Sequence, residues 1–270
     1  MSPRKASEFR KNQANLKKKE DDRMLAKSLG VIGGMGPKAT SVFFDKVVEN
    51  TVAHKDQDHI DMIILNHASL PDRTTAILTD REEEFLQAVS RDFKLLEHAE
   101  VSNIAIPCNT SHYFYDKMQA MTNINIINMV EETIKEIHAV YGENSKIGIL
   151  ATKGTIRTGI YEQWCNQYNM QLHLPTELQQ EQVMDIIYNN VKGDLDVDPT
   201  ELESMIHDLV FEENCSCVIL ACTELSCIKL SDEAERYAVD AMGVLVEKSI
   251  ELSGKSSKTA EKKALTTIGQ

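Results

Sequence analysis

Short apolar runs alternate with longer stretches of helical spacing along most of this chain. The runs are rich in Ile, Val and Leu and are bounded by polar or turn-forming residues, a pattern typical of strands buried in a parallel sheet. We expect strands at residues 29–32, 60–65, 104–107, 124–127, 146–151, 172–174 and 218–221.

Amphipathic helices are predicted between these runs. Apolar side chains within residues 82–100 repeat at helical spacing and would cover one side of a helix; they are Phe85, Leu86, Val89, Phe93 and Leu96. Similar spacing predicts helices that begin at Pro37 or lie near 130–141, 177–191, 199–213 and 232–252. Strands that alternate with helices in this way predict an α/β fold with mostly parallel sheets.

The same pattern restarts after the polar turn that follows Tyr141. In the first part of the chain, 75 positions separate Gly33, at the start of a glycine-rich loop, from Cys108. In the second part, 70 positions separate Thr152 from Cys222. This recurrence predicts two pseudo-symmetric, three-layer α/β halves with an active site in the cleft between them.

The domain organisation follows from this division. We expect residues 28–131 together with 232–252 to form the first α/β domain, and residues 132–231 to form the second. The flanking segments 1–27 and 253–270 carry many charges and few apolar residues. We therefore expect a flexible basic extension at one end and a flexible tail at the other.

The net charge of −13 is unevenly distributed. Residues 1–29 carry nine Lys or Arg against four Asp or Glu, residues 254–270 carry four against one, and −21 remains between them. So acidic a core would repel nucleic acid and anionic membranes, and we expect neither as a partner. No apolar run is long enough to span a membrane. The six cysteines are scattered along the chain, which indicates reduced thiols in the cytoplasm. Their spacing is not that of a zinc site, so we expect no bound metal.

Two of the cysteines stand out because each ends an apolar strand in a matching place of the two halves. The polar residues that follow them are Asn109, Thr110, Ser111, Thr223 and Glu224. Taken singly, Cys108 and Cys222 would each most often be buried structural residues. As a pair, each before the expected start of a helix, they could remove a proton from one face of a carbon and return one to the other.

Five segments together resemble the aspartate/glutamate racemase family, and the resemblance covers residues 29–252. They are Gly33-Gly-Met-Gly-Pro37, Pro71-Asp-Arg-Thr74, Pro107-Cys-Asn-Thr-Ser-His112, Ala151-Thr-Lys-Gly-Thr155 and Ala221-Cys-Thr-Glu-Leu225. The resemblance implies Cys108 and Cys222 as opposed catalytic bases. It also implies no cofactor, an acidic amino acid as the small-molecule partner, and a homodimer.

The resemblance further implies a set of substrate-binding residues, namely Met35, Arg73, Asn109, Thr110, Ser111, Thr152, Lys192 and Thr223. Arg73 and Lys192 would hold the two carboxylates of a dicarboxylic amino acid, although cations of this kind most often lie on the surface. Glu224 either steadies the second cysteine loop or contacts the substrate amine. We expect His112 to be a hydrogen-bonded structural residue rather than a base.

We therefore expect cofactor-independent racemisation of aspartate, possibly of glutamate, by proton exchange at Cα. Two other functions fit the same features. The first is a decarboxylase or isomerase of small dicarboxylic acids on this scaffold, although a decarboxylase needs only one cysteine. The second is a non-catalytic domain that binds an acidic amino acid.

Overall fold

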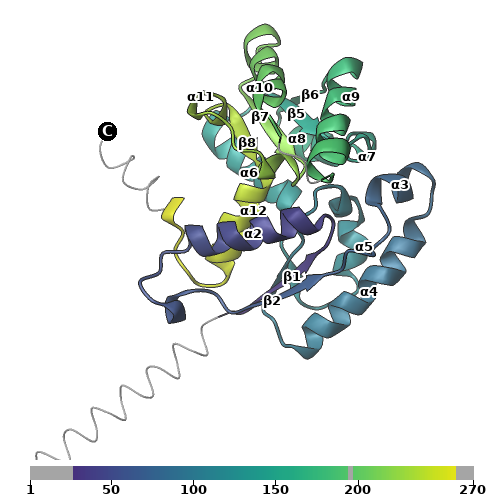
Figure 1. Cartoon of the computed structure of the whole chain (residues 1–270), viewed down its shortest axis with the longest axis vertical. Coiled ribbons are helices and arrows are strands. Elements are labelled where there is room, and N and C mark those ends of the chain that lie inside the picture. Colours follow the sequence, from purple (N-terminus) through teal and green to yellow (C-terminus); the bar gives the residue numbers. More distant parts are fainter. Residues whose placement is uncertain (1–26, 194–196, 260–270) are drawn as a thin grey trace, which may run out of the picture.

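The computed structural model describes residues 27–193 and 197–259, which form two α/β halves (Figure 1). Each half contains a four-stranded sheet, and every pair of neighbouring strands is parallel. The strand order is β2-β1-β3-β4 in one sheet and β6-β5-β7-β8 in the other, so both have the same topology. The predicted fold class is confirmed. Most of the basic extension and the end of the tail lie outside the described residues.

The first sheet consists of β1 (Leu29–Gly33), β2 (Met62–Asn66), β3 (Asn103–Ala105) and β4 (Asn125–Ile126). Its connections contain α2 (Pro37–Asn50), η1 (Asp56–Asp58), α3 (Arg73–Leu78), α4 (Glu82–His98), η2 (Thr110–Phe114) and α5 (Tyr115–Gln119). Helix α6 (Met129–Tyr141) leads to the second half. As the sequence predicts, α2 begins at Pro37, where the missing N–H costs no helical hydrogen bond.

The second sheet consists of β5 (Lys146–Ala151), β6 (Gln171–His173), β7 (Cys217–Ala221) and β8 (Ala238–Asp240). Its connections contain α7 (Lys153–Thr158), α8 (Ile160–Gln167), α9 (Glu177–Asp185), η3 (Ile186–Val191), α10 (Thr200–His207), η4 (Asp208–Glu212), η5 (Leu225–Cys227) and α11 (Asp232–Glu235), and α12 (Ala241–Leu252) follows. The segments η3 and η4 are π-helical continuations of α9 and α10. Such wide turns within helices often occur at functional sites.

The prediction of one helix over residues 232–252 is wrong. Its middle contains β8, which pairs with β7 and completes the second sheet, so this segment does not lie wholly with the first half. The segment instead contains the short helix α11 before β8 and the helix α12 after it, and α12 packs against both α2 and α6. The division into two domains otherwise stays a prediction.

The beginning of the predicted flexible tail is packed against the first half. Ser253 and Ser257 are buried, and Ser257 forms an antiparallel bridge with Thr51. The amide of Val52 also donates to the carbonyl of Ser256 at 2.9 Å. These contacts tie the chain after α12 to the end of α2.

One apolar cluster joins the two halves. It contains Val31 of β1 and Phe43 of α2 from the first half, Ile149 of β5 and Ile219 of β7 from the second, and residues of α6 and α12. A second cluster lies wholly in the second half and a third wholly in the first. Since separating the halves would expose the shared cluster to water, we expect them to move as one body.

Gly34 lets the chain turn sharply after β1, and its replacement should destabilise the fold. Its φ is +88°, and an added Cβ would lie 2.4 Å from the carbonyl carbon of His67. We expect Gly34→Ala to lower the free energy of unfolding by about 3 kcal/mol, from backbone strain and overpacking together. Gly159→Ala is the control, because Gly159 has φ +65° in the left-handed helical region, an added Cβ would meet only Glu162 Oε2 at 3.8 Å, and the change should cost only about 1 kcal/mol. If chemical denaturation gives the same loss in free energy of unfolding for both glycine variants, the close approach of His67 to Gly34 is contradicted.

Candidate active site

The two thiols lie at equivalent carboxyl ends of the two sheets. Cys108 follows β3, the third strand of the first half, and Cys222 follows β7, the third strand of the second. The glycine loop and Thr152 likewise follow the first strands, β1 and β5. The residues after each cysteine form short 3₁₀ turns, η2 and η5, where the sequence predicted helix starts.

Cys108 and Cys222 line one and the same buried cavity, and they are 5% and 6% exposed. The other lining residues are Met35, Asp72, Arg73, Thr74, Asn109, Thr110, Thr152, Tyr188, Lys192, Thr223 and Glu224. Thr223 also links the two cysteine loops, because its hydroxyl donates to the carbonyl of Pro107 at 3.2 Å. The cavity therefore brings together all the predicted site residues except Ser111, whose hydroxyl donates to the Cys108 carbonyl instead.

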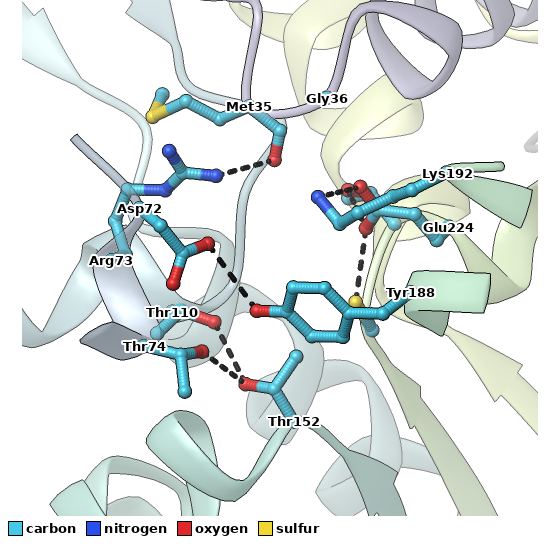
Figure 2. Close-up of polar contacts among 12 residues, drawn as sticks. Met35, Gly36, Asp72, Arg73, Thr74, Thr110, Thr152, Tyr188, Lys192 and Glu224 are labelled. Atoms are coloured by element: carbon cyan, nitrogen blue, oxygen red, sulfur yellow. Dashed lines mark hydrogen bonds and ion pairs between the residues drawn. The ribbon is translucent and has the colours of Figure 1, made fainter. Parts of the chain in front are cut away.

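Arg73 is a buried cation in this cavity, at the first turn of α3. Its Nη1 donates to the carbonyl of Pro71 at 3.0 Å. Its Nη2 donates to that of Met35 at 3.1 Å (Figure 2). Burial alone would lower the pKa of Arg73, but the charges of Cys108 and Asp72 raise it above its usual value. Its buried Nε forms no hydrogen bond with any described residue, so one donor is left for a ligand.

Asn109 offers a second unused donor beside Cys108. The hydroxyl of Tyr161 donates to Asn109 Oδ1 at 2.5 Å and thereby fixes the orientation of the amide. The opposite atom, Nδ2, is buried and has no hydrogen-bond partner in the described part of the chain. A preorganised, unpaired N–H₂ group is suited to bind a carboxylate.

Cys222, Glu224 and Lys192 form a charged cluster on the other side of the cavity. The Cys222 thiol donates to Glu224 Oε2 at 3.0 Å, and Lys192 Nζ lies 2.8 Å from Glu224 Oε1 (Figure 2). Burial raises the pKa of the Cys222 thiol well above its usual value, and the Glu224 carboxylate raises it further. Cys222 is therefore a thiol at neutral pH.

The same cluster brings Lys192 near both thiols. Burial alone would lower the pKa of Lys192, yet the Glu224 carboxylate raises it above its usual value. Lys192 lines the same cavity as the cysteines of both halves. Glu224, which the sequence placed either in the loop or at the substrate, here contacts Cys222 and faces the cavity.

Buried threonine hydroxyls form the remaining polar wall. Thr110 and Thr152 lie 3.1 Å apart, and Thr74 donates to Thr152 at 3.4 Å (Figure 2). Thr152 also caps α7, since its Oγ1 accepts from the amide of Thr155 at 3.1 Å. Capping and lining the cavity are therefore compatible roles for this residue.

His112 supports the first cysteine loop from behind. Its Nδ1 lies 2.8 Å from the Cys108 carbonyl, and burial lowers its pKa, so the ring is neutral. It does not line the cavity. The predicted hydrogen bonding of His112 is confirmed, and its structural role stays a prediction.

Asp72, Thr74 and Tyr188 line the cavity but were not predicted. Asp72 and Thr74 flank Arg73 in the segment used for the resemblance, and Asp72 Oδ1 caps α3 by accepting from the amide of Thr75 at 2.8 Å. Tyr188 precedes Lys192 by four residues, a spacing that puts both on one side of a helical turn. From that spacing, the sequence could have placed Tyr188 next to Lys192 in the site.

Fold and site together define a two-lobed α/β protein with paired thiols in one buried cavity. A family model described as "Asp/Glu/Hydantoin racemase" matches residues 32–248. The chain belongs to this family of isomerases with small amino-acid substrates. Among the described residues, no helix is both long and apolar enough to cross a bilayer.

Three relatives illustrate the similarity. The chain is 27% identical to the broad specificity amino-acid racemase RacX of Bacillus subtilis (strain 168) over 82% of this chain and 96% of the relative. The structure of Picrophilus torridus aspartate racemase matches with a TM-score of 0.74 and 28% identity, over 87% of this chain and 98% of that one. A glutamate racemase from Francisella tularensis subsp. tularensis SCHU S4 shares the fold, with a TM-score of 0.57, 18% identity, and coverage of 84% and 81%.

Proposed function

We propose that this protein racemises aspartate, and secondarily glutamate, by exchanging the Cα proton between Cys108 and Cys222. The observation that supports this proposal best is the single buried cavity that both thiols line, with unpaired donors on Arg73 and Asn109. A site of this kind can bind a carboxylate and hold the adjacent carbon between two acid–base groups.

The charges of the cavity favour a dicarboxylic amino acid. Aspartate carries two carboxylates and one ammonium, and the cavity offers Arg73, Lys192 and Glu224 as their opposites. The substrate ammonium would take the place of Lys192 at Glu224, which frees Lys192 for the second carboxylate. A neutral amino acid would leave Lys192, whose side chain is only 25% exposed, without a carboxylate partner, at a cost in binding free energy.

The roles of the two thiols are proposed from their neighbours. Cys108 has the Arg73 guanidinium beside it, and we propose it as the base that removes the α-proton. Cys222, held by Glu224, is the thiol that donates a proton to the opposite face. Turnover leaves Cys108 as the thiol and Cys222 as the thiolate, which is the state that accepts the other enantiomer.

Deprotonation at Cα places a second negative charge on the oxygens of the substrate carboxylate. The donors available to stabilise it are Asn109 Nδ2, the Arg73 guanidinium and the hydroxyls of Thr110 and Thr223. In a cavity shielded from water, fixed donors of this kind supply several kcal/mol each toward lowering the barrier.

A broader amino-acid racemase is the second candidate, because one relative at 27% identity bears that description. We also propose that the protein is cytoplasmic and forms a homodimer. Light scattering of the purified protein would test the homodimer. Decarboxylation of a small diacid and simple binding of an acidic amino acid are competing functions that the assay must separate from racemisation.

Incubation of the protein with L-aspartate in D₂O tests the proposal. We expect the optical signal to decay to zero and deuterium to enter at Cα, in the absence of any added cofactor. Release of CO₂ would identify a decarboxylase, and a bound ligand without exchange would identify a binding domain. Equal rates with several neutral amino acids would favour the broader racemase.

A further inference from the structure

The cavity is too small for any amino acid as it stands. Its free volume is only about 10 Å³, which is room for about one water molecule. Some part of its wall must therefore move before a substrate enters. The shared apolar cluster opposes a rotation of one half against the other, so the movement is local.

One side of the cavity wall consists of residues that are not fully buried. The cysteine loops, Arg73 and the threonine cluster are all buried. In contrast, Tyr188 and Asp72 are partly exposed, and the Lys192 side chain is 25% exposed. Tyr188 lies in the π-helical segment η3 and Lys192 directly follows it, so both side chains are carried by one turn of the second half.

Tyr188 connects that turn to the first half across the mouth of the cavity. Its hydroxyl donates to Asp72 Oδ2 at 3.3 Å, and Lys192 Nζ lies 5.4 Å from the centre of its ring. Figure 2 shows the ring reaching across toward Asp72, below the Lys192–Glu224 pair. Because burial raises the pKa of Tyr188 to about 12, its hydroxyl stays protonated and keeps donating to Asp72 at neutral pH.

We propose that Tyr188, positioned by Asp72, is the residue that limits the length of the substrate side chain. The ring closes the cavity over the bound molecule, and the Asp72 hydrogen bond sets how far it can withdraw. This inference rests on the proposed function, since it concerns the substrate of the same site. It predicts a preference for the shorter diacid that does not depend on the thiols.

Binding of succinate and glutarate by calorimetry tests this inference without requiring turnover. The two diacids differ by one methylene, and we expect the wild-type protein to bind succinate at least about tenfold more tightly. Tyr188→Ala should bring that ratio close to one, and the same variant should raise kcat/KM for glutamate relative to aspartate. Tyr188→Leu should reduce the ratio partly and serves if the alanine variant does not fold.

Three further variants separate positioning from simple loss of structure. Tyr188→Phe removes the hydrogen bond but keeps the ring. Asp72→Asn keeps the oxygen that caps α3 but replaces the charged acceptor of the Tyr188 hydroxyl by a neutral amide group. We expect each to lower the ratio by a few fold. Tyr237→Ala removes a partly buried tyrosine that packs on Phe211 outside the cavity, and it should leave the ratio unchanged.

The outcomes are distinguishable. If the protein binds the diacids but Tyr188→Ala and Tyr188→Leu keep the wild-type ratio, the inference is overturned while the proposed function stands. If the wild-type protein binds neither diacid and exchanges no Cα proton, both are overturned.

Discussion

Serine in place of either Cys108 or Cys222 should lower racemisation of aspartate by about 10³-fold or more, because a positioned acid–base group contributes up to about 10⁴-fold and serine is a far weaker acid. Each variant retains one working thiol. We therefore expect each to exchange the Cα proton of one enantiomer with D₂O without inverting it. The two variants should prefer opposite enantiomers, and ¹H NMR of separate L- and D-aspartate samples measures this directly.

Cys215→Ser is the matched control for the thiol variants. Cys215 is also buried, but it precedes β7 and lies outside the cavity, so its replacement should change the rate by less than about twofold. The two-base assignment would be wrong if either Cys108→Ser or Cys222→Ser racemised at near wild-type rates. Exchange of the same enantiomer by both variants would also contradict opposed thiols.

The second large effect is expected at Arg73. Arg73→Leu removes the cation beside Cys108, leaves two backbone carbonyls without their donor, and should lower kcat/KM for aspartate on the order of 10³-fold. Arg73→Lys keeps the charge but not the forked geometry that reaches both carbonyls, so a loss of about 10²-fold is expected. Steady-state kinetics with aspartate measure both.

Arg81→Gln provides the comparison for a loss of charge alone. Arg81 is an exposed arginine that pairs with Glu84 at 2.7 Å, and pairs of this kind contribute little. Its replacement should leave kcat/KM within about twofold. An Arg73→Leu protein that folds and keeps more than a tenth of wild-type kcat/KM would remove Arg73 from the proposed site.

The sequence predicted the sheets and the thiols well for a simple physical reason. Buried parallel strands are continuous apolar runs, and residues that follow such strands gather at one edge of the sheet. The sequence therefore predicts that Cys108 and Cys222 share a site, without knowledge of the contacts between helices. Arg73 and Lys192 could not be predicted in this way, and only the resemblance singled them out.

The missed features depend on contacts between distant parts of the chain. The strand β8 has three residues, too few to show a period, and its neighbours carry apolar residues at helical spacing. Tyr188 reaches Asp72 only because the two halves meet, and 116 positions separate them. Ser111 has the right neighbours in sequence, but its hydroxyl turns back to the Cys108 carbonyl.

The shared apolar cluster has a consequence for how the protein is made. Helix α12 is the last of the elements that complete this cluster, and it packs against α2 and α6, which precede it by more than a hundred residues. While a ribosome is still producing the chain, the shared cluster therefore stays exposed to water on the side that this helix later covers, although each half can already bury its own separate cluster.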